Sequence, residues 1–165
     1  MKNLPRPNVQ LIDRHSYVSI RQCIANFPAC GKMPHKMNSS TNNVVRCITE
    51  SEMAKSVVYR AHKANNNMSP EDILTLLAMQ WSNAFDPNRS LKSNRGAVWI
   101  KTVTFISETY NENRRNDTVP IAIGLKSNSH DIVERYFIDE INELSTGINN
   151  MFYCSRMRKT CLCPL

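Results

Sequence analysis

Apolar residues recur at helical spacing in four stretches of this chain, and the clearest of these stretches spans residues 70–83. Its apolar stripe consists of Ile73, Leu76, Leu77 and Trp81. Ser69 can cap such a helix, Pro70 fits its first position, and Asp72 stands three residues after the cap, where a carboxylate reaches free backbone amides. The pattern predicts a helix whose apolar face needs partners.

Two flanking stretches can supply those partners. A helix over residues 49–65 would begin at a Thr49 cap and place apolar residues on successive turns. A helix over residues 97–113 would carry Trp99 and Tyr110 on its apolar face. We expect these two helices and the central one to form a small core around the two tryptophans.

A fourth helix is predicted to begin at Ser129 and to end at Gly147. Its apolar face consists of Val133, Phe137, Ile141 and Leu144. Its opposite side is acidic, with Asp131, Glu134, Asp139, Glu140 and Glu143. An acidic surface repels nucleic acid, so we expect this side to face solvent or a protein partner.

These elements predict an all-α fold: a three-helix core, a fourth amphipathic helix and basic flanking arms. Only four glycines in 165 residues also suit a helical protein better than a β-sandwich or barrel. We expect a basic N-terminal arm rich in proline and asparagine over residues 1–48, a helical domain over 49–147 and a basic, cysteine-rich tail over 148–165. For the tail, disorder is the favoured interpretation, with a nuclear-import or phosphate-contacting patch or a metal-binding tail as alternatives.

Charge and motifs point to a binding protein. The formal net charge is +7, and its cations concentrate outside the fourth helix, which favours a polyanionic partner. The chain has no phosphate-binding glycine loop, no HExxH and no GxSxG motif, and its four histidines are isolated from one another in sequence. We therefore expect no enzymatic activity, no cofactor and no metal.

The start of the chain resembles no secretory leader, and no apolar run is long enough to span a bilayer. These features favour an intracellular protein without membrane contact. Six cysteines leave two possibilities open, reduced thiols or a disulfide framework. A zinc site could draw on Cys23, Cys30, His35 and Cys47, but their spacing matches no compact zinc finger.

Three segments carry a family resemblance: Val57-Val-Tyr-Arg-Ala-His62, Asp72-Ile-Leu-Thr-Leu-Leu-Ala-Met-Gln-Trp81, and Trp99 with Val103 and Tyr110. Together they resemble the HMG-like alpha box of fungal mating-type proteins over about 60 residues. The resemblance implies an L-shaped helical domain that bends DNA at the minor groove beside a partner transcription factor. Part of the same segment also looks like a Myb-like trihelix domain, which likewise implies DNA binding.

On these grounds the predicted function is that of a nuclear, sequence-specific DNA-binding transcription regulator. The resemblance assigns Tyr59 and Arg60 to the aromatic-Arg pair of the box, while Lys55 and Lys63 flank that pair on the same helix. A polar loop between the tryptophans adds further cations. The predicted DNA-binding residues are Lys55, Tyr59, Arg60, Lys63, Arg89, Lys92 and Arg95.

A second class of function fits the cysteines. A secreted helical cytokine or hormone could close a Cys23–Cys30 loop, a long Cys47–Cys154 bridge and a terminal pair. Four asparagines stand in sequons that allow N-glycosylation, at Asn38, Asn67, Asn88 and Asn116. This ligand is the alternative to the DNA-binding regulator.

Overall fold

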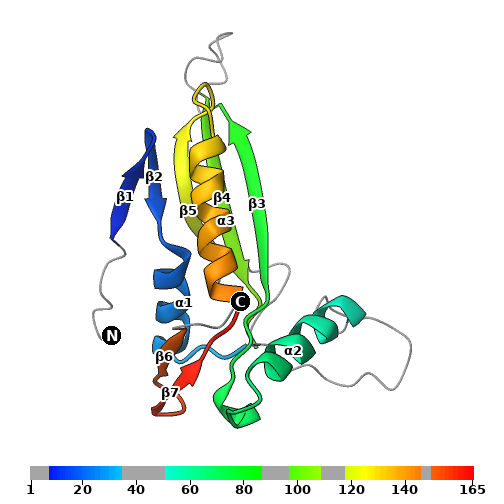
Figure 1. Ribbon diagram of the computed structural model, residues 1–165. Coiled ribbons are helices and arrows are strands. Elements are labelled where there is room, and N and C mark those ends of the chain that lie inside the picture. Colours follow the sequence, from blue (N-terminus) through cyan, green and yellow to red (C-terminus); the bar gives the residue numbers. More distant parts are fainter. Residues whose placement is uncertain (1–7, 35–50, 87–96, 109–117, 146–149) are drawn as a thin grey trace.

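The computed structural model describes residues 8–34, 51–86, 97–108, 118–145 and 150–165. Within these ranges the chain forms three α-helices and seven strands (Figure 1). The strands make up two antiparallel sheets. The prediction of an all-α fold is therefore wrong. The protein is mixed α and β, and the HMG-like alpha box, which requires a helical core, is not its architecture.

A five-stranded antiparallel sheet forms the centre of the molecule, with strand order β1-β2-β5-β4-β3. The strands are β1 (Val9–Ile12), β2 (His15–Val18), β3 (Ala78–Phe85), β4 (Val98–Phe105) and β5 (Thr118–Leu125). The register shifts between β4 and β5 at Lys101 and Thr102, where Ile121 is the extra residue of a bulge. Strands β1 and β2 come from the segment predicted to be an arm, and they complete the sheet beside β5.

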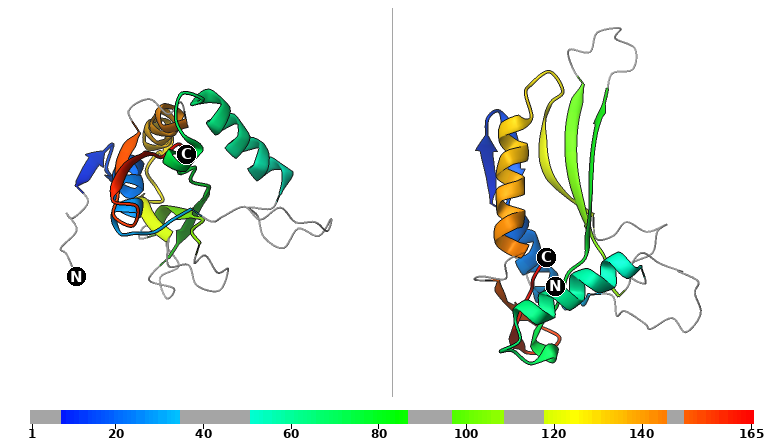
Figure 2. Two further views of the ribbon diagram at one scale, coloured as in Figure 1. Left: turned by 90° about the horizontal axis from the view of Figure 1, so that it is seen from below. Right: turned by 45° about the vertical axis from the view of Figure 1, so that its right-hand side comes forward.

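Helix α3 (Asp131–Ser145) covers one face of this sheet, as both views in Figure 2 show. Helix α1 (Ile20–Ala29) continues from β2 on the same side and packs against α3 and a hairpin of β6 (Met151–Cys154) and β7 (Lys159–Leu162). We call the face under α3 the inner face and the opposite one the outer face. The core consists of inner-face side chains together with α1, α3 and the hairpin.

Residues 70–83 do not form the predicted central helix. Pro70–Asp72 make one turn of 3-10 helix, and the chain then runs extended into β3. The amides of Leu74 and Leu76 donate to the carbonyls of Leu162 and Pro164, so this segment pairs with the end of the chain instead of with itself. The carboxy-terminal segment thus supplies hydrogen bonds that local periodicity could not reveal.

The predicted helix over residues 97–113 is also wrong within the described range. Residues 98–105 are strand β4, in which Trp99, Lys101 and Val103 alternate with outer-face residues. The side chains of this stretch are largely β-branched, and these pack better on a pleated sheet than on a helix. Residues 109–113, including Tyr110, lie outside the described part of the chain.

Two predicted helices are confirmed. Helix α2 (Glu52–Ala64) lies within the predicted range of 49–65, although Ser51 rather than Thr49 caps it by accepting from the amide of Ala54. Helix α3 buries Val133, Phe137 and Leu144, which belong to the predicted apolar face. Residues 151–162 of the predicted disordered tail instead form the β6–β7 hairpin. Neither α2 nor any other described helix combines the length and apolar character needed to cross a membrane.

Candidate functional site

Helix α2 extends away from the sheet and offers one side to solvent (Figures 1 and 2). The exposed side carries Tyr59, Arg60 and Lys63, which fall together because positions three and four apart share a helix face. Lys55 lies at the edge of this side, and its Nζ is 2.9 Å from a carboxylate oxygen of Glu52. The structure thus brings four of the seven predicted DNA-binding residues onto one helix.

The opposite side of α2 is only loosely packed. Ala54 is the one residue of this helix with a fully buried position, while Val58 and His62 border a cavity of about 570 Å³ between the helix and the body. The rest of the cavity wall combines apolar side chains, from the 73–77 segment, Met33, Ile106 and Met157, with the charged residues Glu71, Glu108 and Arg156. His62 therefore faces the body of the protein rather than the surface formed by Tyr59, Arg60 and Lys63.

The three remaining predicted DNA-binding residues, Arg89, Lys92 and Arg95, lie outside the described residues. Their segment connects β3 to β4 at the end of these strands.

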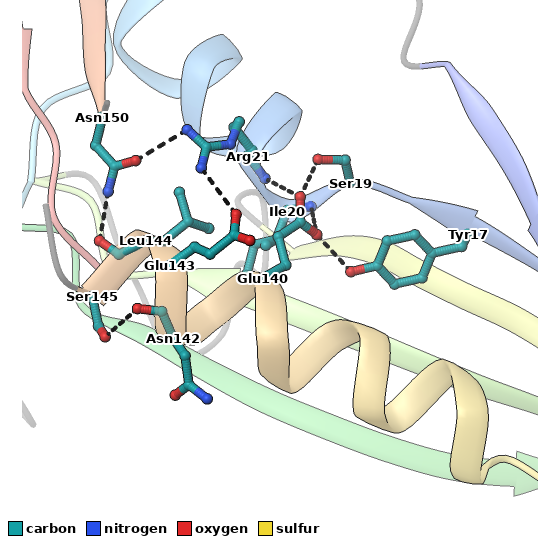
Figure 3. Close-up of polar contacts among 10 residues, drawn as sticks. All are labelled: Tyr17, Ser19, Ile20, Arg21, Glu140, Asn142, Glu143, Leu144, Ser145 and Asn150. Carbon is teal, nitrogen blue, oxygen red and sulfur yellow. Dashed lines mark hydrogen bonds and ion pairs between the residues drawn. The ribbon is translucent and has the colours of Figure 1, made fainter. Parts of the chain in front are cut away.

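A polar cluster joins α3 to the start of α1, and its centre is the carboxylate of Glu140 (Figure 3). The hydroxyl of Tyr17 donates to it at 2.7 Å, and Ser19 Oγ also donates to it. The amides of Ile20 and Arg21 donate at 3.0 and 3.3 Å, so Glu140 satisfies free amides at the beginning of α1. Four donors saturate this carboxylate, which makes it a structural cap and leaves it poorly suited to act as a general base.

The cluster continues through Arg21 to the hairpin. One guanidinium nitrogen lies 3.5 Å from the carboxylate of Glu143, and another donates to Asn150 Oδ1 at 3.2 Å. Asn150 in turn donates to the carbonyl of Leu144 near the end of α3.

The acidic side of α3 was predicted to face solvent or a partner, but Glu140 is half-buried and binds within the protein. Burial, followed by the hydrogen bond to Glu140, raises the pKa of Tyr17.

Two histidines that are distant in sequence meet on the inner face. His15 Nδ1 donates to the carbonyl of Asp13 at 2.8 Å. In the neutral ring its Nε2 then accepts from His130 Nδ1 at 2.9 Å. His130 stacks on Trp99 with ring centroids 4.3 Å apart. Burial, followed by the proximity of His15, lowers the pKa of His130. The pair connects β2 with the start of α3, and sequence spacing gave no sign of it.

A buried ion pair lies nearby on the same face. The ammonium group of Lys101 is fully buried, donates to Glu134 of α3 and sits 4.3 Å from the centre of the Phe137 ring. Lys101 and Glu134 bind each other across the boundary between sheet and helix. This contact secures α3 to β4 and keeps the ammonium group of Lys101 away from solvent.

The described cysteines are free thiols. The Cys23–Cys30 disulfide of the secreted-ligand alternative and its terminal pair are therefore not formed, and Cys47 lies outside the described residues. Burial raises the pKa of Cys23 to about 11 and that of Cys163 to about 12, which keeps both protonated and unreactive at neutral pH. The described ranges contain no group of three or more histidine, cysteine, aspartate or glutamate side chains able to hold a metal ion.

Searches for related proteins add no assignment. No protein-family model, curated protein or solved structure matches this chain.

Proposed function

We propose that the protein binds DNA through the solvent side of α2. The observation that carries this proposal is a single exposed helix face with an aromatic residue, Tyr59, beside two cations, Arg60 and Lys63. Lysine and arginine at such a position neutralise backbone phosphates and release counterions. The formal net charge of +7 favours approach to a polyanion from a distance.

The mixed fold changes the mode of binding that we propose. A projecting helix can lie along a groove or across the phosphate backbone without the concave L-shape of an HMG-like box. We assign Arg60 and Lys63 to phosphate contacts and Tyr59 to packing against sugar or base. Lys55 should contribute less, because Glu52 already neutralises part of its charge. A role as a sequence-specific transcription regulator in the nucleus, beside a partner factor, extends this proposal.

Fluorescence anisotropy with a short labelled duplex across a salt series tests the proposal. For the wild-type protein we expect log K to fall linearly with log salt concentration. Combining Arg60→Ala with Lys63→Ala removes two phosphate contacts and should reduce the slope by about 2, since each contact contributes about 0.9. Lys55→Ala should change the slope less than either of these substitutions alone.

The matched control combines Lys126→Ala with Arg135→Ala. Both residues are exposed and lie away from α2, at the end of β5 and on α3. This control lowers the net charge by the same amount, so it should leave the slope close to that of the wild type. Equal losses in the two double variants would show a general charge effect and refute the role of α2. Absence of binding at low salt would refute DNA binding itself.

A further inference from the structure

The outer face of the five-stranded sheet carries exposed apolar side chains. No described helix lies across this face (Figure 2). Cross-strand pairs share a face, and the chain of pairs from Leu11 through Ser16 to Ile123 and Ile100 places these residues on the same side. The large apolar side chains that the sheet leaves exposed all lie on this side: Val9, Leu11, Trp81, Phe85, Ile123 and Leu125. Monomeric proteins rarely expose a contiguous apolar surface of this kind without a partner.

The outer face is also electrically neutral. Its remaining positions carry only apolar, hydroxyl or amide side chains, among them Asn83, Ile100 and Thr102. Within the described part of the sheet, no ionisable side chain lies on this face. Nucleic acid would find no cation there. Two copies of a chain with a net charge of +7 repel each other, and a neutral surface is where they can approach most closely.

The size of the face suits association of two copies. Strands β3, β4 and β5 have eight residues each, which corresponds to a length of about 26 Å. Strands β1 and β2 have only four residues each, so five strands spaced about 4.8 Å apart give a flat area on the order of 400 Å². Side chains that rise from this plane increase the accessible area, which brings it near the roughly 800 Å² that each partner contributes to a standard interface.

We propose that the outer face is the interface of a homodimer in which two sheets pack face to face about a two-fold axis. In this arrangement, Trp81 and Phe85 of each copy lie against the apolar residues of the other. Because the interface is symmetric, a charge placed at its centre occurs twice and has no counter-charge to meet.

Sedimentation velocity of the full chain over a range of concentrations tests this proposal. The wild-type protein should sediment increasingly as a dimer as its concentration rises, whereas Ile123→Glu should sediment as a monomer. The matched control is Ile132→Glu, which alters an equally exposed isoleucine on α3 and should dimerise like the wild type. Far-UV circular dichroism establishes that each variant is folded. If Ile123→Glu does not fold, Trp81→Lys on the edge strand replaces it.

Two outcomes would overturn the proposal. A wild-type protein that stays monomeric at every concentration would exclude the dimer. A dimer that persists in folded Ile123→Glu, or in its substitute Trp81→Lys, would show that another surface mediates association, such as the open edge of β3.

Discussion

The two faces of the five-stranded sheet come from the same strands but differ in burial and charge. On the inner face, Trp99 is 7% exposed and stacks on a histidine, and a buried lysine is paired with a glutamate from α3. On the outer face, Trp81 is 57% exposed and has uncharged neighbours. The covering elements make the difference, because α1 and α3 bring apolar cover and α3 also brings the polar partners that buried charges require. The inner face therefore stabilises the fold, and the outer face remains available for association.

The largest expected effect is the difference in unfolding free energy between alanine variants of the two tryptophans. Trp99→Ala should lower the free energy of unfolding by about 3–5 kcal/mol, because it removes a large buried ring and leaves a cavity under α3. Trp81→Ala should change the stability of the monomer by only about 0.5 kcal/mol, as expected at an exposed position. Urea unfolding followed by circular dichroism measures both at a protein concentration where wild type is monomeric. Equal losses of unfolding free energy in the two variants would contradict the difference in burial between the two faces.

The buried ion pair should give the next largest effect. Glu134→Gln leaves the fully buried Lys101 without a carboxylate and should cost about 1.5–3 kcal/mol of unfolding free energy, because the amide oxygen still accepts a hydrogen bond but carries no charge. Lys101→Met should cost less, because Glu134 is about one third exposed and retains contact with water. Thr102→Ala, one residue further along β4 on the outer face, serves as the control with little effect. The same urea experiment ranks the three variants, and a larger loss for Lys101→Met than for Glu134→Gln would contradict this account.

Two neighbouring residues of β5 also allow the inner and outer faces to be compared, with a smaller expected loss of stability. Gly124 lies on the inner face beneath His15, and a Cβ atom at this position would overlap the imidazole ring. Gly124→Ala should therefore lower the unfolding free energy by about 1–3 kcal/mol, since either the ring or the strand must move. Ile123→Ala, on the outer face, should have a smaller effect on the monomer. Thermal unfolding of both variants at low protein concentration provides the test.

The helices and the sheet differed in how well the sequence predicted them. Helices α2 and α3 were predicted because their apolar stripes and their start signals occur within a single local segment. Strand β3 was mistaken for a helix because its hydrogen-bonding partners are in the next strand, β4, outside the local window in which helical spacing is judged. Apolar residues on both sides of β4 also satisfied the helical spacing by coincidence. In β3, the alternation of Met79 and Trp81 with Gln80 and Ser82 was the available sign of a strand.

The candidate sites also differ in whether a local sequence pattern could predict them. The helical repeat alone placed Tyr59, Arg60 and Lys63 on one side of α2, so their common exposure followed from a correctly predicted helix. The apolar outer face and the contact between His15 and His130 could not be predicted. Both depend on strand register and on a long-range connection between β2, β5 and α3, which the local pattern does not encode.

The smallest predicted effect is a dependence of stability on pH, which arises from the inner face and not from the outer face. The pKa of His130 is lowered in the folded protein, so the unfolded chain binds a proton at a higher pH than the folded one. The contribution of His130 to stability should be complete above its ordinary pKa of about 6.5 and should be lost as pH falls through that value toward the lower folded pKa. Urea midpoints measured between about pH 7.5 and 5.5 should decline in the wild type and decline less in His130→Gln. The outer face has no ionisable side chain among its described residues, so Trp81→Ala should keep the wild-type pH dependence. A wild-type midpoint that stays constant over this range would show that the His15–His130 contact does not disfavour protonation of His130.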